Sequence, residues 1–299
     1  MKKLEVRALD KVSVKVPLGS VVALVGPNGA GKTTLIKILS TLLLPTSGSA
    51  YVMGHDVVRD VKEVRRSIGL MLTGERLFYY RLTGYENLLF FATLYDMPLA
   101  EAKARARELL EAVGLGRWGD VQYMKYSLGM QRRLALARAL IHDPPVLLLD
   151  EPTLGMDPVS ARELRGLIKV MARDKAVLFT SHYMGEVEGL ADYIYVIKYG
   201  RIVARGTPQE LKSIVGSVLE VKARLDGIPR DLQRFVVFVR DGAAWLRVPK
   251  SMADALGDGA EIVGEDQATL EDVYAYLVGE TPLEIDYRSR RGGWGGRGG

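Results

Sequence analysis

The fold of this chain is decided by the stretch Gly26-Pro27-Asn28-Gly29-Ala30-Gly31-Lys32-Thr33-Thr34. It matches the pattern G-x-x-x-x-G-K-[ST], in which a glycine-rich turn brings backbone N–H groups against phosphate oxygens. The apolar run 21–25 directly before it is typical of a buried parallel strand. We expect a helix to begin near Lys32, with the positive end of its dipole toward the phosphates. The stretch therefore predicts a strand, a phosphate-binding loop and a helix.

The side chains of this loop suit a nucleoside triphosphate with its metal ion. Lys32 would reach the terminal phosphates, and the Thr33 hydroxyl would bind Mg²⁺. The candidate nucleotide-binding residues of the loop are Gly26, Pro27, Asn28, Gly29, Ala30, Gly31, Lys32, Thr33 and Thr34.

A second stretch, Val146-Leu147-Leu148-Leu149-Asp150-Glu151, is an apolar strand that ends in two carboxylates. One carboxylate would hold Mg²⁺ and the other would activate water. Phosphoryl transfer needs positioning and charge neutralisation more than covalent chemistry. Together the two stretches predict nucleoside triphosphate hydrolysis.

Further segments appear in a fixed order along the chain. They are Ile68-Gly69, Leu82-Thr83-Gly84-Tyr85-Glu86-Asn87-Leu88, Tyr126-Ser127-Leu128-Gly129-Met130-Gln131-Arg132-Arg133, Pro152-Thr153-Leu154-Gly155-Met156-Asp157 and Phe179-Thr180-Ser181-His182. With the phosphate loop, this set resembles the nucleotide-binding domain of ABC transporters over about residues 4–211. Segments 82–88 and 126–130 look most like the exporter-type ATPases paired with drug, sodium, lipid or polysaccharide permeases.

The resemblance implies roles for three residues around the phosphates. Asp150 would hold Mg²⁺ through water, Glu151 would polarise the attacking water, and His182 would contact the γ-phosphate. Taken alone, His182 would more often be a surface or core histidine, and the two carboxylates could be solvated charges at a strand end. Their places after apolar strands, in the register of the family, favour the functional interpretation.

The resemblance also implies that two chains complete each site. Ser127 and Gly129 would form a signature loop that binds the γ-phosphate of the ATP held by the other subunit, and Asp157 would lie on the dimer seam. Ser127 can also cap the helix that follows it, which is compatible with anion binding. Asp157 before Pro158 is also a common turn or helix start. An ATP-dependent homodimer with ATP and Mg²⁺ is therefore expected.

The sequence departs from the family pattern in three respects. The signature usually reads Leu-Ser-Gly-Gly-Gln, and here Leu128 and Met130 replace a glycine and the glutamine. The family's glutamine after segment 68–69 is absent, and either Thr73 or Glu75 replaces it. Lys3 stands where the family has the aromatic residue that stacks on adenine. Either the true start lies upstream or the base is held by other contacts.

Composition agrees with these expectations. The chain has 299 residues, a formal net charge of +5 and no cysteine. The lack of cysteine rules out a disulfide framework and fits a cytosolic setting. No secretory signal is visible and no stretch approaches 18 apolar residues, so the permease of such a transporter would be a separate chain. We expect the protein at the cytoplasmic face of the membrane, bound through that permease.

The chain is expected to contain an α/β P-loop NTPase fold of ABC type with a helical subdomain, followed by a small α+β C-terminal domain. We place the ATPase domain at 1–213 with its helical subdomain at about 75–140, the small domain at 214–280, and a disordered Arg/Gly-rich tail at 281–299. Helical stretches are predicted at 100–115 and 134–142.

In the small domain we predict strands at 218–221, 235–239 and 245–248, and a helix capped by Thr269 that runs to about 278. Two apolar clusters lie in the predicted helical subdomain. Residues 88–91 are expected to pack in its core. Within the other cluster, 77–80, core packing and docking on the permease stay equally open for 78–80.

Two functional classes remain. The first is the ATP-hydrolysing subunit of an exporter. The second is a soluble ABC-type ATPase that acts on ribosomes or nucleic acid, which only the basic tail supports. A single ATPase domain and the lack of a long coiled-coil insertion favour the first. Nucleic acid is therefore an unlikely partner, and the transported substrate cannot be read from this chain.

Overall fold

The computed structural model describes residues 6–73, 78–257 and 259–279. Along the chain, two compact units meet between Ile202 and Val203. The predictions for Lys3, Glu75 and the tail 281–299 fall outside the described residues.

The first unit is built on a six-stranded sheet with the strand order β4-β5-β6-β1-β7-β8, of which β8 begins in this unit and continues past Ile202. Its strands are β1 Val21–Val25, β4 Ile68–Met71, β5 Val146–Asp150, β6 Ala176–Ser181, β7 Tyr193–Lys198 and β8 Arg201–Gly206. From β4 to β7 every neighbouring pair is parallel, and β1 lies between β6 and β7. The carboxyl ends of β1, β5 and β6 therefore meet at one edge of the sheet. A short antiparallel pair, β2 Tyr51–Val52 and β3 His55–Asp56, lies apart from this sheet.

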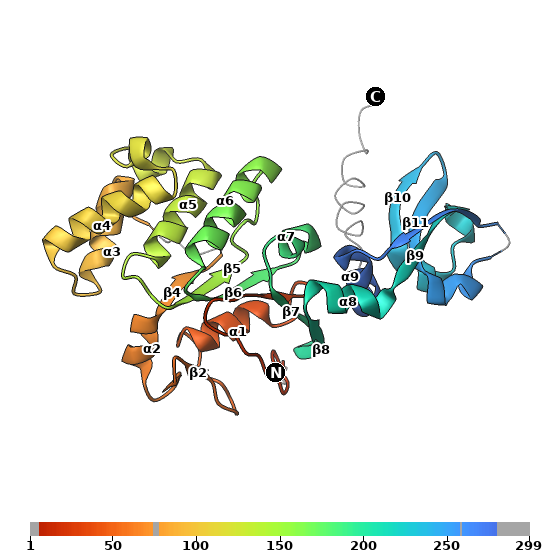
Figure 1. The fold of residues 1–299 in the computed structure, drawn as a ribbon, viewed down its shortest axis with the longest axis horizontal. Coiled ribbons are helices and arrows are strands. Elements are labelled where there is room, and N and C mark those ends of the chain that lie inside the picture. Colours follow the sequence, from red (N-terminus) through yellow and green to blue (C-terminus); the bar gives the residue numbers. More distant parts are fainter. Residues whose placement is uncertain (1–5, 74–77, 258, 280–299) are drawn as a thin grey trace, which may run out of the picture. The chain divides into compact units, whose positions relative to one another are not determined.

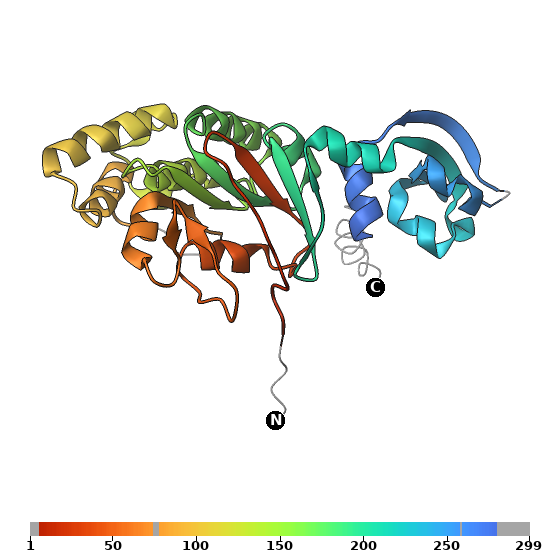
Figure 2. The same ribbon diagram turned by 60° about the horizontal axis from the view of Figure 1, so that its bottom comes forward.

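Helices cover both faces of this sheet, with α1 on one face and α5 and α6 on the other (Figures 1 and 2). The helices of this unit are α1 Lys32–Leu39, α2 Val61–Ser67, α3 Gly84–Thr93, α4 Leu99–Ala112, α5 Leu128–Ala139, α6 Pro158–Met171 and α7 Met184–Glu188. Two 3₁₀ turns stand at Gly116–Trp118 and Tyr123–Lys125. A parallel sheet covered on both faces is the predicted α/β architecture.

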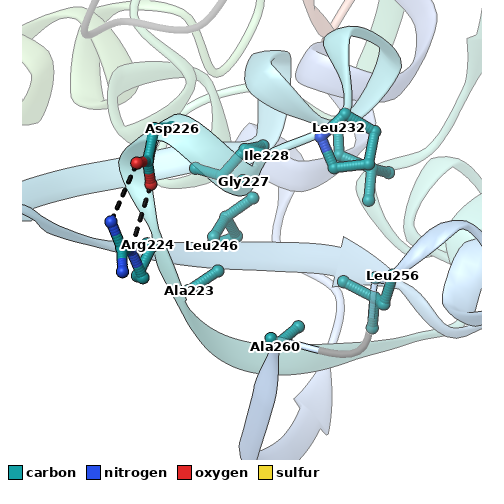
Figure 3. A pocket seen from close by; sticks show the side chains of 12 residues that line it. Ala223, Arg224, Asp226, Gly227, Ile228, Leu232, Leu246, Leu256 and Ala260 are labelled. Atoms are coloured by element: carbon teal, nitrogen blue, oxygen red, sulfur yellow. Dashed lines mark hydrogen bonds and ion pairs between the residues drawn. The ribbon is translucent and has the colours of Figure 1, made fainter.

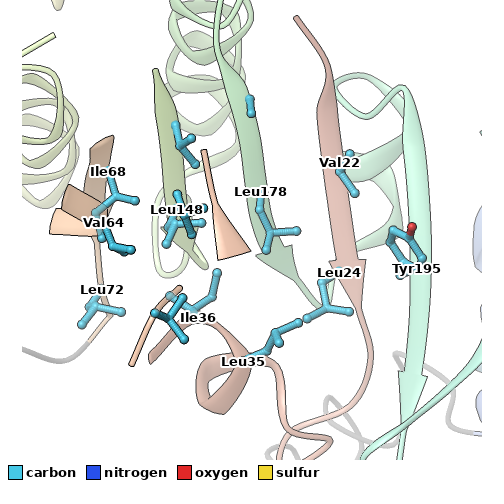
Figure 4. Close-up of a cluster of buried hydrophobic side chains, with 14 of the residues drawn as sticks. Val22, Leu24, Leu35, Ile36, Val64, Ile68, Leu72, Leu148, Leu178 and Tyr195 are labelled. Carbon is cyan, nitrogen blue, oxygen red and sulfur yellow. The ribbon is translucent and has the colours of Figure 1, made fainter. Parts of the chain in front are cut away.

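The core beneath α1 fixes the helix against the sheet. Leu24, Leu148 and Leu178 project from three neighbouring strands toward Leu35 and Ile36 of α1 (Figure 4). All five are buried. Each such side chain contributes about 1.5–3 kcal/mol on burial. The packing holds the start of α1 directly after the phosphate loop.

Capping residues place the helix starts in the 84–139 region. The helix predicted at 134–142 begins earlier, at Leu128, because the Ser127 hydroxyl caps it by accepting from the backbone N–H of Met130. It ends at Ala139. The helix predicted at 100–115 is α4, which ends at Ala112. Thr83 starts α3 with a capping box.

The two aromatic clusters of this region differ in exposure. Leu88 is fully buried, and Phe91 packs edge-on against Phe78. Phe78 is itself buried, so core packing accounts for it. Tyr79 and Tyr80 are each 52% exposed. Among the described residues of the cluster 77–80, these two tyrosines lie on the surface and remain candidates for docking.

The second unit is a four-stranded antiparallel sheet, in the order β10-β11-β9-β12, with two helices. Its strands and helices are α8 Pro208–Val215, β9 Ser217–Arg224, β10 Val236–Arg240, β11 Ala243–Pro249, β12 Glu261–Gln267 and α9 Leu270–Val278. Its 3₁₀ segments are Leu225–Gly227, Arg230–Phe235 and Lys250–Ala255.

The sequence located most of this unit and missed one strand. The three predicted strands and the helix capped by Thr269 are present. β12 was missed because its sequence, EIVGEDQ, is acidic and mostly exposed. The boundary predicted at 213 cuts α8, whereas α8 packs against α9 within the second unit.

A cavity of about 370 Å³ lies inside the second unit (Figure 3). Apolar side chains such as Leu232, Leu246 and Leu256 line most of it, and an ion pair of Arg224 with Asp226, 2.9 Å apart, stands at its wall. The cavity takes no residue from the phosphate loop or from the strand-end carboxylates.

Among the described residues, no helix combines the length and the apolar character needed to cross a membrane.

A half-buried histidine, His142, makes the stability of the first unit depend on pH. The His142 ring stacks on Tyr95 with centroids 3.7 Å apart, and its Nε2 donates to the Ile68 carbonyl at 3.0 Å. Burial lowers the pKa of His142 from 6.5 to about 4. The folded pKa is depressed, so the unfolded chain binds a proton first as the pH falls. The stabilisation is present above pH 6.5 and is lost between there and about pH 4.

We expect the wild type to lose about 2 kcal/mol more unfolding free energy between pH 7 and pH 5 than a His142→Gln variant. Glutamine offers an N–H donor to the Ile68 carbonyl and does not titrate. Urea unfolding at the two pH values measures the difference. Equal pH dependence of the two proteins would contradict the assignment of a neutral half-buried histidine.

Candidate functional site

The phosphate loop has a backbone that only glycine accommodates at three positions. Gly29 and Gly31 have φ angles of 79° and 105°, in the left-handed region. A Cβ atom on Gly31 would lie 2.4 Å from the Ala8 carbonyl oxygen, and one on Gly26 would lie 2.2 Å from that of Ile197. The glycines predicted from the sequence are therefore required by conformation and by close backbone approach.

Lys32 is held over this loop as the first residue of α1. Its Nζ donates to the carbonyl oxygens of Gly26, at 2.6 Å, and Pro27, at 3.1 Å. The same Nζ lies 3.7 Å from Glu151 Oε1. The side chain is only 5% exposed. A buried cation at the start of a helix suits the binding of phosphate oxygens.

Asp150 is buried at the end of β5 and faces two hydroxyl groups. Its Oδ2 accepts from Thr33 Oγ1 at 3.0 Å, and its Oδ1 accepts from Thr180 Oγ1 at 2.6 Å. The contact with Thr33 joins the phosphate loop to the strand-end carboxylate. The two side chains predicted to hold the metal ion, those of Thr33 and Asp150, are therefore in contact with each other.

Glu151 has the unusual φ angle of 45°, which few non-glycine residues adopt. Its backbone N–H donates to Thr180 Oγ1 at 2.9 Å. Its Oε2 lies 3.3 Å from His182 Nδ1. Strained backbone of this kind is found where the surroundings fix a functional side chain. Here the strain turns the carboxylate toward His182 and Lys32.

The same neighbours keep the Glu151 carboxylate ionised. His182, whose Nδ1 lies 3.3 Å from Oε2, is the largest cause that lowers the pKa of Glu151, and Lys32 lowers it further. Partial burial acts in the opposite direction. At neutral pH the group is therefore a carboxylate that can accept a proton.

Thr180 has no role predicted from the sequence, although it joins the Asp150 carboxylate to the backbone of Glu151. Thr180 is fully buried in β6, donates to Asp150 and accepts from the Glu151 backbone. A polar residue at the end of an apolar strand was the available signal. Thr73, at the place of the family's glutamine, donates to the backbone carbonyl of Asp150 at 2.5 Å.

Ser127, Gly129 and Asp157 lie away from this cluster within one chain. Ser127 caps α5, on the face of the sheet opposite α1 (Figure 1). A Cβ on Gly129 would meet its nearest neighbour, Ser160, at an ordinary 3.5 Å. Asp157 caps α6 by accepting from the N–H groups of Val159 and Ser160. No hydrogen bond between described residues joins these three positions to the phosphate loop.

The parallel sheet explains the cluster that does form. The phosphate loop follows β1, the two carboxylates end β5, and His182 follows β6. Ligands of open α/β sheets bind beyond the carboxyl ends of the strands. A phosphate loop, a buried carboxylate beside a loop hydroxyl, and a second carboxylate beside a histidine define a P-loop nucleotide hydrolase.

Comparisons with known proteins identify the family. The family model for ABC transporters matches residues 9–154. The daunorubicin resistance ATP-binding protein DrrA3 of Streptomyces coeruleorubidus is 39% identical over 292 residues, which cover 92% of each chain. The ABC transporter ATP-binding protein NatA of Bacillus subtilis strain 168 is 40% identical over 70% of this chain and 86% of its own.

A solved structure has the same fold. The ATP-binding cassette MJ0796, as a dimer in a post-hydrolysis state with ADP and phosphate, is 27% identical with a TM-score of 0.63. The match covers 69% of this chain and 93% of that one. The chain belongs to the ABC transporter family and is its nucleotide-binding ATPase component. The resemblance inferred from the sequence and the predicted fold class are confirmed.

Proposed function

We propose that this protein hydrolyses ATP to power a separate membrane-spanning permease of an exporter. The observation that carries the proposal is the meeting of Lys32, Thr33, Asp150, Glu151 and His182 at one edge of the sheet. Each residue type has a distinct task in phosphoryl transfer, which depends on positioning and charge neutralisation.

In the proposed mechanism, residues 26–34 hold the phosphates through backbone N–H groups and Lys32. Thr33 and Asp150 would hold Mg²⁺, which neutralises phosphate charge when bound. Mg²⁺ is bound in such sites by one or two carboxylates together with substrate phosphates. The pair fits this need, because it places one hydroxyl and one carboxylate together, with Thr33 Oγ1 3.0 Å from Asp150 Oδ2.

Glu151 would accept the proton of the attacking water. His182, whose Nδ1 faces this carboxylate, would donate to the γ-phosphate and orient Glu151. The lowered pKa keeps the base ionised, and the strained backbone at Glu151 fixes its direction.

A second copy of the chain would complete the site. Ser127 and Gly129 would contact the γ-phosphate bound by the partner subunit, and Asp157 would lie on the seam. Ser127 caps α5, and α5 lies on the face of the sheet opposite α1 (Figure 1), which supports a role for Ser127 toward a second chain. The dimer of the similar cassette MJ0796 supports it as well.

The proposed direction of transport and the proposed location of the protein rest on its similarity to known relatives. The relatives with the names daunorubicin resistance and doxorubicin resistance ATP-binding protein favour export. We place the protein at the cytoplasmic face of the membrane, held by its permease. The exposed Tyr79 and Tyr80 are the proposed docking residues.

The test is copurification with the membrane protein encoded by the neighbouring reading frame. We expect a complex in detergent whose affinity falls about tenfold or more in a Tyr79→Ala, Tyr80→Ala double variant, since exposed tyrosines often dominate interfaces. Tyr199→Ala, at an 82% exposed tyrosine of the same unit, is the matched control. Copurification of ribosomal particles in place of the membrane protein would favour the alternative function.

A further inference from the structure

Glu186, in the first turn of α7, collects three partners from three segments of the first unit. Its Oε2 accepts from Ser181 Oγ at 2.8 Å, and its Oε1 accepts from Thr153 Oγ1. Arg165 of α6 lies 3.7 Å from Oε1. The Glu186 side chain is 16% exposed, and both hydroxyl donors are buried.

The two hydroxyl donors belong to the segments that carry the proposed catalytic pair. Ser181 directly precedes His182, and Thr153 follows Glu151 by two residues. Ser181 Oγ also accepts from the backbone N–H of Tyr183 at 3.0 Å, so the peptide that follows His182 is bonded to this hydroxyl. A continuous set of hydrogen bonds thus runs from the His182 loop through Glu186 to Thr153.

Thr153 also leads into the segment that ends at Asp157. Its backbone carbonyl accepts from the Met156 N–H at 3.1 Å, which makes Thr153 the start of a turn. Because bonds to an ionised carboxylate are stronger than bonds between neutral groups, Glu186 holds the two segments more firmly than a neutral acceptor would. Removing it would take the acceptor from the buried Thr153 hydroxyl and leave the buried Ser181 hydroxyl with the Tyr183 carbonyl at 3.4 Å.

We propose that Glu186 is a positioning residue that sets the distance between His182 and Glu151 by joining the His182 loop to Thr153. The inference rests on the proposed function of that pair. Glu186 also links His182 to the segment 153–157, so a movement of that segment on dimerisation would reach the histidine through one carboxylate.

The first test compares turnover and apparent affinity. Glu186→Ala should lower kcat for ATP by about 10- to 100-fold, because small displacements of catalytic groups cost that much. KM should stay within about threefold, because the phosphate loop is untouched. Glu186→Gln should keep kcat within about threefold, since its amide can bond both hydroxyls. Glu188→Ala, at an exposed carboxylate of the same helix, is the matched control and should behave as the wild type.

The second test asks whether Glu186 acts through His182. In a His182→Ala background, measured under single-turnover conditions, the additional loss from Glu186→Ala should disappear. If Glu186→Ala does not fold, Thr153→Val and Ser181→Ala decide, and each should lower kcat with little change in KM.

Unchanged kcat in Glu186→Ala, or a loss of the same size with and without His182, would overturn the inference. So would unchanged turnover in both hydroxyl variants. If the wild type hydrolyses ATP in such an experiment, only the role of Glu186 is overturned and the proposed function is retained. If the wild type has no ATPase activity, the proposed function itself is overturned.

Discussion

A Glu151→Gln variant should bind ATP as the wild type does and hydrolyse it about 10²- to 10⁴-fold more slowly, which is the range for loss of a general base. Glutamine has the size of glutamate and keeps one acceptor oxygen. It cannot take up a proton at neutral pH. The contacts that Lys32, Thr33 and Asp150 make do not require residue 151 to accept a proton, so the binding of ATP should persist.

Single-turnover hydrolysis and equilibrium titration with ATP measure the two quantities separately. Lys32→Ala serves as the contrasting variant, since it should weaken nucleotide binding itself. Near-normal turnover in Glu151→Gln would remove Glu151 as the base. The position of its carboxylate, 3.3 Å from His182 Nδ1, makes His182→Ala the next variant to examine in that case.

A Ser127→Arg substitution should abolish the ATP-dependent dimer while each chain still binds ATP. The experiment uses the Glu151→Gln background with ATP and Mg²⁺. In this background ATP hydrolysis is too slow to cause the nucleotide-bound dimer to dissociate. Arginine would place bulk at the surface where the partner's phosphate is proposed to lie. We expect the dimer affinity to fall by about 100-fold or more, as when a central interface residue is lost.

Light scattering at several protein concentrations reports the result. Ser127→Ala is the matched control. It removes the helix cap, which costs about 1 kcal/mol of stability, without adding bulk. Comparing the two variants separates weakening of α5 from obstruction of the interface. A Ser127→Arg protein that still dimerises with ATP would contradict a site shared between two chains.

The sequence determined the local chemistry of this protein. The glycines of 26–31 were recognisable because a phosphate-binding turn needs left-handed φ angles and close backbone approach, and few other needs produce that spacing. The strands before the loop and before Asp150 were recognisable because strands buried on both faces are continuously apolar. Helix starts were recognisable at Thr269, where the cap and its third-position carboxylate are adjacent in sequence.

Features set by distant neighbours were beyond sequence reasoning. The start of α5 was placed too late because the helix as a whole has no clear apolar face that would mark its first turn. β12 was missed because its identity as a strand comes from pairing with β9 and not from its own residues. Both are cases in which tertiary contacts override weak local preferences.

The tertiary structure alone decided how the candidate site is assembled. Parallel pairing of β5 with β6 sets Asp150 beside Thr180, so one hydroxyl can bridge the aspartate side chain and the Glu151 backbone. The same pairing brings the ends of the strands that precede Thr153 and His182 together, and Glu186 joins them. These contacts link residues about 30 positions apart, and their geometry depends on which strands lie side by side. The sequence specified the groups that do the chemistry, and the sheet register specified their distances.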